Sequence, residues 1–116
     1  MSASQLIALR LYFPLSARGK ATRFWHRFSA PALGHYLLER ARRADIHQAV
    51  MHGVQAGYLP GGRLLHAQLE GAPQGMPQCL ELIDTEGHLR KFLRDHAEEL
   101  SQARAVLYRI EMPLAG

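Results

Sequence analysis

Residues 48–66 constrain the fold more than any other stretch of this chain, because they read as a strand, a glycine-rich turn and a second strand. Side chains at residues 49–54 alternate between two different faces, the period of two that is typical of a strand. Regular structure is then broken within a short distance by Gly57, Pro60, Gly61 and Gly62. Glycines permit positive φ and leave N–H groups uncovered, which favours an irregular loop with some capacity to hold an anion.

The length of 116 residues fits one domain, residues 1–116, with a core that needs neither disulfides nor metal. Cys79 is the only cysteine, which excludes an intrachain disulfide and a multi-cysteine zinc site. Its neighbours in QCLELID predict a buried, inert position in a strand. No run of residues is long and apolar enough to span a membrane, and no secretory leader is evident. We therefore expect a cytoplasmic protein.

The net charge of +4 is carried mainly by arginine and favours anionic partners. Arginines alternate with aromatic side chains in residues 18–28, from Arg18 to Phe28, a composition that can contact phosphates and stack on bases. The same composition also fits a loop or short helix whose aromatics dock on the core or on a neighbouring subunit. No RNA-binding signature accompanies the segment, so the sequence disfavours a nucleic-acid partner without excluding one.

Two amphipathic helices are predicted. The first begins with Ser29 as cap, followed by Pro31, and runs to about Ala44. Its buried stripe comprises Leu33, Tyr36, Leu37, Ala41 and Ala44. The second follows the caps offered by Asp84 and Thr85. Its buried stripe comprises Leu89, Phe92, Leu93, Ala97 and Leu100.

Strands complete the pattern. Residues 6–13 form a first strand with one apolar face, which ends at Pro14. Leu80 and Leu82 share one face of a later strand. Residues 105–112 form the last strand. Residues 63–70 form a short arm of the hairpin. The order predicts an α+β protein, a ferredoxin-like βαββαβ sandwich with an elaborated hairpin between core strands two and three and two helices on one sheet face.

With its elements in this order, the chain resembles the PII-like proteins of the domain of unknown function 190 family. The matching segments are LRLYF, PALGHYLLERARRADIHQAV, GVQAGY with the downstream LLHAQ, and CLELIDTEGHLRKFL. The resemblance covers about 90 residues and rests on the order and spacing of short motifs. It implies a homotrimer whose sheets line a central barrel, with ligands in clefts between subunits and a mobile loop that signals to a partner protein.

Three features depart from that family. The link between the first strand and the first helix is longer, and His52 stands where an arginine often precedes the glycine. The loss of this fixed charge weakens an anion site at that position. The region after the second helix reads LSQARAVLYRI and lacks the glycine- and lysine-rich phosphate loop of PII signalling proteins. The resemblance therefore does not transfer ATP binding to this chain.

The resemblance favours a non-enzymatic sensor that binds a small anionic ligand or nucleotide and signals through residues 57–63. The candidate ligand-binding residues are Gly53, Gly57, Tyr58, Gly61, Gly62, Arg63 and His66. Backbone N–H groups would supply donors and Arg63 the positive charge. The nature of the cofactor or ligand stays open.

Two alternatives remain. One is a basic RNA-binding or partner-docking module that uses residues 18–28, and the other is a small enzyme that uses His52 or His66 as a base. No carboxylate or nucleophile stands at a telling spacing from either histidine, although partners can meet in space. The seven histidines include no pair at i and i+4, so we expect no metal site.

Overall fold

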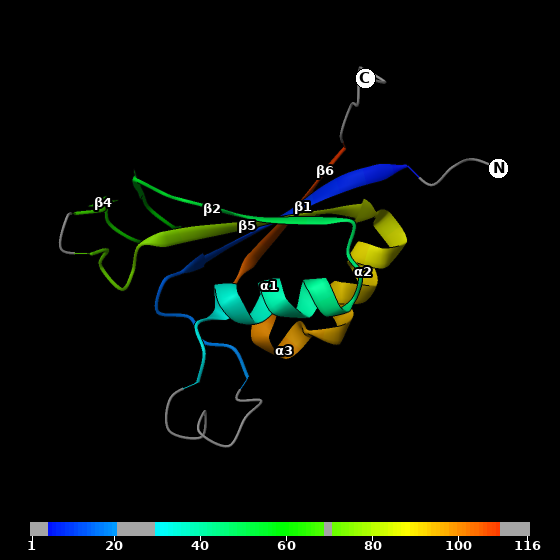
Figure 1. Cartoon of the computed structure of the whole chain (residues 1–116). Coiled ribbons are helices and arrows are strands. Elements are labelled where there is room, and N and C mark those ends of the chain that lie inside the picture. Colours follow the sequence, from blue (N-terminus) through cyan, green and yellow to red (C-terminus); the bar gives the residue numbers. More distant parts are fainter. Residues whose placement is uncertain (1–4, 21–29, 69–70, 110–116) are drawn as a thin grey trace.

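The computed structural model describes residues 5–20, 30–68 and 71–109. Its centre is a four-stranded antiparallel sheet in the order β2-β5-β1-β6. The sheet comprises β1 (Leu6–Pro14), β2 (Gln48–His52), β5 (Pro77–Thr85) and β6 (Arg104–Arg109). One face of it is covered by α1 (Leu33–Arg43), α2 (Glu86–Asp95) and the short α3 (Ala97–Leu100) (Figure 1). The predicted ferredoxin-like α+β sandwich is confirmed.

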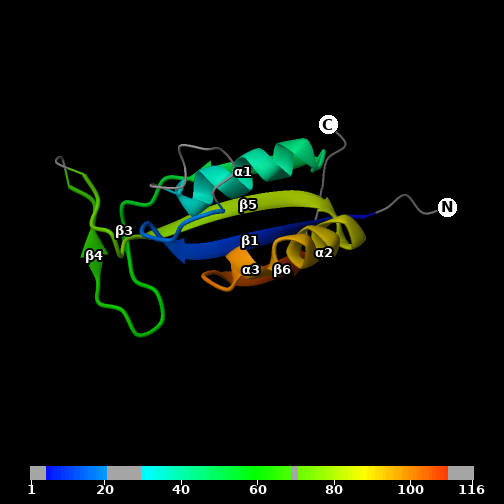
Figure 2. The ribbon, with the colours of Figure 1, turned by 90° about the horizontal axis from the view of Figure 1, so that it is seen from below.

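The core lies between the helices and the two central strands. Leu9 pairs with Leu82 and Leu11 with Leu80, so four leucines with no exposed surface meet the helices from adjacent strands. The remaining large, fully buried side chains are Phe13, Leu33, Leu37 and Leu89. Seen from the helical side, α1 covers the β2 and β5 half of the sheet, whereas α2 and α3 cover the β1 and β6 half (Figure 2).

The first helix begins later than the sequence predicted. Its N-cap is Ala32, without a side-chain hydrogen bond, and Ser29 lies outside the described residues. The Leu33 N–H donates instead to the carbonyl of Ala17, 2.9 Å away, so the loop after β1 takes the place of a side-chain cap. The helix ends at Arg43 and leaves Ala44 exposed, so the prediction that Ala44 lies in the buried stripe was wrong.

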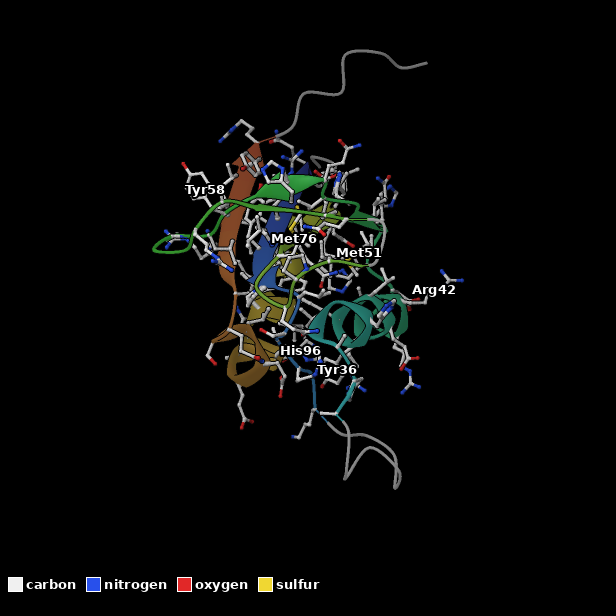
Figure 3. All side chains as sticks on the ribbon, turned by 90° about the vertical axis from the view of Figure 1, so that its left-hand side faces the viewer. Tyr36, Arg42, Met51, Tyr58, Met76 and His96 are labelled. Atoms are coloured by element: carbon white, nitrogen blue, oxygen red, sulfur yellow. The ribbon has the colours of Figure 1, made fainter. Side chains whose placement is uncertain are left out.

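The second predicted helix is broken at His96. This residue has φ −120° and ψ 27° and separates α2 from α3. Its ring is buried against Phe92, with ring centroids 4.5 Å apart, and meets Tyr36 edge-on at 6.1 Å (Figure 3). Burial, together with the nearby charge of Arg40, lowers the pKa of His96. Ala97, just after the break, is exposed, so the prediction that Ala97 lies in the buried stripe was wrong.

The elaborated hairpin forms a separate two-stranded ribbon between β2 and β5. Its strands are β3 (Ala56–Gly57) and β4 (Leu65–His66), paired antiparallel. The predicted arm 63–70 is therefore much shorter than expected, and residues 69 and 70 lie outside the described part. The last strand ends at Arg109, where the described residues also end. No helix in the described ranges is long and apolar enough to cross a membrane.

The Asp84 carboxylate joins two parts of the fold that are distant in sequence. It is 8% exposed and accepts hydrogen bonds from the backbone N–H of His47 at 2.7 Å and of Thr85 at 2.6 Å. His88 Nδ1 lies 3.0 Å from the same carboxylate, and Thr85 caps α2 as predicted. Burial raises the pKa of Asp84, but the two N–H donors and His88 outweigh burial and hold the pKa below its ordinary value.

We expect Asp84→Asn to destabilise the protein by about 1 to 3 kcal/mol at neutral pH, because a buried acceptor loses charge and part of its hydrogen bonding. Since the folded-state pKa of Asp84 is lowered, its stabilisation is complete above about pH 4 and is lost as the pH falls through the folded value. Denaturant unfolding at a series of pH values measures this. A difference between the two proteins that does not shrink in acid would contradict the assignment.

Leu89→Ala should lower the free energy of unfolding by about 2 to 5 kcal/mol, because it removes a side chain with no exposed surface from the core. The matched control is Arg94→Ala on the outer face of the same helix, with an expected change within about 0.5 kcal/mol. Urea melts of both variants make the comparison. Equal and small effects would show that α2 does not pack through this stripe.

Candidate functional site

The ribbon carries most of the residues that the sequence singled out for ligand binding. Gly57 pairs with Leu65 and Ala56 with His66, and the Ala67 N–H donates to the Gln55 carbonyl at 2.8 Å. The ribbon extends beyond the end of the sheet, clear of the helical layer (Figure 2). The structure thus brings Gly57, Tyr58, Gly61, Gly62, Arg63 and His66 together on one projecting element. Gly53 lies apart from them, just after β2.

The turn at the tip needs only one of its glycines for backbone reasons. Gly61 has φ +81°, a conformation that favours glycine. The N–H of Gly62 donates to the Leu59 carbonyl at 2.8 Å and closes the turn. That N–H is therefore not a free donor, which reduces the set of backbone groups that an anion at the tip can use.

Large apolar side chains are exposed on the ribbon. Tyr58 (Figure 3) is 67% exposed and Leu64 58% exposed. Arg63 and His66 are exposed as well. At the base, Leu65 packs close to Gly75, where an added Cβ would lie 3.5 Å from the leucine methyl. The base of the ribbon therefore packs against the loop at Gly75, whereas its tip is exposed to solvent. Exposed aromatic and aliphatic groups at such a tip are typical of a contact surface.

A second candidate region is the sheet face that the helices do not cover. Glu81 of β5 accepts a hydrogen bond from Arg10 Nε of β1 at 2.8 Å, and the Arg10 guanidinium lies over the ring of Tyr108 at 5.2 Å. His52 Nε2 lies 3.8 Å from the other oxygen of Glu81. The hydrogen bond that Arg10 donates to Glu81 raises the pKa of Arg10, so the guanidinium stays charged.

Apolar side chains surround this ion pair. Val50 is 42%, Val106 38% and Tyr108 40% exposed, and the cross-strand register places Val50 and Val106 on either side of Arg10 and Glu81. One sheet face thus combines exposed apolar groups with a central ion pair. Such a mixture is typical of the surfaces at which proteins associate.

Cys79 also lies on this open face, beside Tyr12. Its thiol is buried, as predicted from the sequence, and burial raises its pKa. The phenol of Tyr108 similarly raises the pKa of Tyr12. Both groups therefore stay protonated at neutral pH, and the thiol lacks the thiolate character that a nucleophile needs.

The two histidines of the enzyme alternative differ in their surroundings. His52 has Glu81 nearby, but 3.8 Å is longer than a hydrogen bond and Arg10 already holds that carboxylate. His66 is exposed on the ribbon opposite Ala56. Neither arrangement is that of a general base oriented by a carboxylate. Within the described ranges no group of three or more His, Cys, Asp and Glu side chains is placed to hold a metal.

Sequence reasoning missed Glu81 and its pairing with Arg10. A signal was available, because Arg10 and Glu81 each stand between two leucines of a strand and so fall on the face opposite the buried leucines. Pairing across strands depends on register, which a single sequence does not give. Gln102 was also missed, because its contact joins two loops that are distant in sequence. The Gln102 side chain accepts a hydrogen bond from the Arg18 N–H at 3.0 Å and donates one to the Arg18 carbonyl at 2.8 Å. These two bonds connect the turn after α3 to the loop after β1.

The contact between Gln102 and Arg18 lies in the region after the second predicted helix, where the sequence lacks the phosphate loop of PII signalling proteins. The turn after α3 contacts the backbone of Arg18 through Gln102, and the Ala103 N–H donates to the Leu100 carbonyl at 3.0 Å. The Arg18 guanidinium itself turns toward the carbonyls of Leu15 and Ala17. The rest of the basic and aromatic segment, residues 21–28, lies outside the described residues.

No protein-family model matches the chain, and no curated protein matches it. Among solved structures, it is similar to CPII, a nitrogen regulatory PII-like protein from Thiomonas intermedia K12, solved bound to ADP, AMP and bicarbonate. The match has 12% identity and a TM-score of 0.51 and covers 91% of this chain and 87% of that one. A putative PII-like signalling protein from Thermus thermophilus matches with 15% identity and a TM-score of 0.48, over 92% and 87% of the two chains.

At such low identity the likeness concerns the fold and not the activity. The closer membership in the domain of unknown function 190 family stays a prediction. The strand order β2-β5-β1-β6, the helical layer on one face and the ribbon between β2 and β5 agree with the likeness. The chain therefore has the ferredoxin-like fold of PII-like proteins.

Proposed function

We propose that this protein is a non-enzymatic PII-like regulator that assembles as a homotrimer through the open face of its sheet. A small anionic ligand or nucleotide binds in a cleft between subunits, and residues 57–63 of the ribbon carry the signal to a partner protein. The observation that carries the proposal is the exposed ribbon that the chain forms between the core strands β2 and β5 in the sequence. A ribbon in that position can change its contacts without disturbing the core.

The open sheet face supports assembly. Three of the large exposed apolar side chains, Val50, Val106 and Tyr108, lie on it. Burying them against a second copy removes apolar surface from water, which stabilises association. The ion pair of Arg10 and Glu81 gives the same face a polar element that favours one orientation over others.

The ribbon supports ligand sensing. Arg63 supplies a positive charge on the same ribbon as the exposed ring of Tyr58, and a guanidinium and an aromatic ring on one element suit a phosphate or carboxylate with a planar base. Since CPII was solved with ADP, AMP and bicarbonate, these anions are the first ligands to test. The turn after α3 lacks a phosphate loop, so the positive charge of the ribbon has a larger part in the proposed site.

Arg63→Ala should weaken the binding of the responsive anion by about tenfold or more, because it removes a charge-assisted contact. Thermal shift with ADP, AMP and bicarbonate measures the response, since a ligand that binds the native state raises the melting temperature. The melting temperature without ligand should stay unchanged, because a side chain on the ribbon contributes little to the core.

Arg94→Ala is the matched control, since it removes the same charge from the outer face of α2. It should leave the anion response intact. If Arg63→Ala keeps every ligand-induced shift, the ribbon takes no part in binding and the proposed site is wrong. If none of the three anions shifts the wild-type protein, the proposed ligand class is wrong.

Val106→Glu should convert the trimer to smaller species, because it places a charge in the proposed interface. Leu64→Glu makes the same kind of exchange on the ribbon, away from the sheet, and should leave the mass unchanged. Light scattering at micromolar concentration gives the mass of each protein. A wild-type protein that is monomeric under these conditions would contradict the trimer and the intersubunit cleft together.

A further inference from the structure

A groove of about 570 Å³ runs between α1 and the start of β2. Its floor is apolar and consists of Leu38, Ile46 and Ala49. One wall is a stripe of α1 that includes Glu39 and Arg42. The groove is lined by residues at the start of β2, whereas the ribbon follows the other end of β2 (Figure 1), so the groove is separate from the proposed ligand site.

The other wall of the groove is the edge of the sheet. β2 is the outermost strand, and within the described residues it pairs with β5 alone. In an antiparallel strand the N–H and C=O groups of alternate residues point to opposite sides, so the outer edge of β2 presents backbone donors and acceptors. An exposed edge of this kind accepts a further strand.

The walls are held in place by contacts that do not depend on an occupant. The His47 N–H donates to Asp84 at 2.7 Å and the Ile46 N–H to the Ala41 carbonyl at 3.1 Å. At the other end, α1 approaches β2 so closely that a Cβ on Gly34 would lie 2.7 Å from the Met51 methyl. The groove is therefore already formed, and an occupant does not bear the cost of opening it.

The charge along the rim selects the occupant. Glu39 is engaged by Arg43 at 3.8 Å, whereas Arg42 has no ion pair among the described residues. Arg42 extends from α1 toward solvent, away from the core (Figure 3). The charge on the rim that no described partner compensates is therefore the positive charge of Arg42. An acidic side chain next to an aliphatic one complements both the rim and the floor.

We infer that this groove is a docking site for an extended, acidic peptide segment of a partner protein. The segment adds as a strand to the outer edge of β2, inserts one aliphatic side chain against Leu38, Ile46 and Ala49, and places a carboxylate opposite Arg42. Backbone pairing supplies sequence-independent affinity, and the floor and rim supply selectivity. The inference does not rest on the proposed anion sensing.

The test uses the full-length protein in its native assembly and a blocked, fluorescent peptide that alternates isoleucine with glutamate. Fluorescence anisotropy should show saturable binding. A peptide with lysine in place of glutamate should bind about tenfold more weakly. A third peptide, N-methylated at every backbone amide, should not bind, because neither of its two edges can then donate to the strand edge.

Arg42→Glu should reverse the preference between the acidic and the basic peptide. Arg94→Glu makes the same charge change on α2 and should alter neither affinity. Failure of the isoleucine and glutamate peptide to bind, undiminished binding of the N-methylated peptide, or an unchanged preference in Arg42→Glu would each overturn the inference. If Arg42→Glu changes the mass by light scattering and no peptide binds, a second copy of the chain occupies the groove instead.

The result is independent of the anion experiment. Loss of peptide binding with an intact response to anions removes the docking site and leaves the proposed sensor in place. Peptide binding without any anion response removes the proposed sensor and leaves the docking site in place. The two experiments are independent because Arg42 and Arg63 lie beyond opposite ends of β2.

Discussion

The hydrogen bonds of the buried Asp84 carboxylate hold together the parts of the molecule on which every proposed surface depends. They fix the entry into β2 through His47 and the start of α2 through Thr85 and His88. A charged group with so little exposure is costly unless it is paired, and here two backbone donors and one imidazole satisfy it. The same bonds set the position of β2, which leads from the groove to the ribbon.

The sequence was sufficient for the order of elements and for most of the core. Periodicity identified β1 and the leucines of β5, and the short, glycine-rich hairpin was correctly placed between two core strands. The predicted ends of the helices were less accurate than the predicted order of the elements. The sequence predicted a side-chain cap at Ser29, whereas the Leu33 N–H at the start of α1 donates to the carbonyl of Ala17, sixteen residues earlier in the chain. A tertiary hydrogen bond of this kind is absent from any local pattern.

The candidate surfaces were less predictable because they depend on register and on burial. Arg10 and Glu81 are separated by 71 residues and meet only through the pairing of β1 with β5. His96, which the sequence treated as part of a continuous helix, is buried against Phe92 and is the residue at which α2 ends. Spacing along the chain reveals neither the pairing of Arg10 with Glu81, which depends on strand register, nor the burial of His96, whose ring also meets Tyr36 of α1.

β2 belongs to all three proposed surfaces. Its outer edge borders the groove, Val50 and His52 lie on the open face, and the ribbon begins after its last residue. A strand of five residues paired on one side only is easier to displace than the central strands β5 and β1. A ligand can shift a conformational equilibrium only by its differential affinity for the two states. Any coupling between anion binding, assembly and peptide docking therefore has its shortest physical route through β2, whose position Asp84 sets.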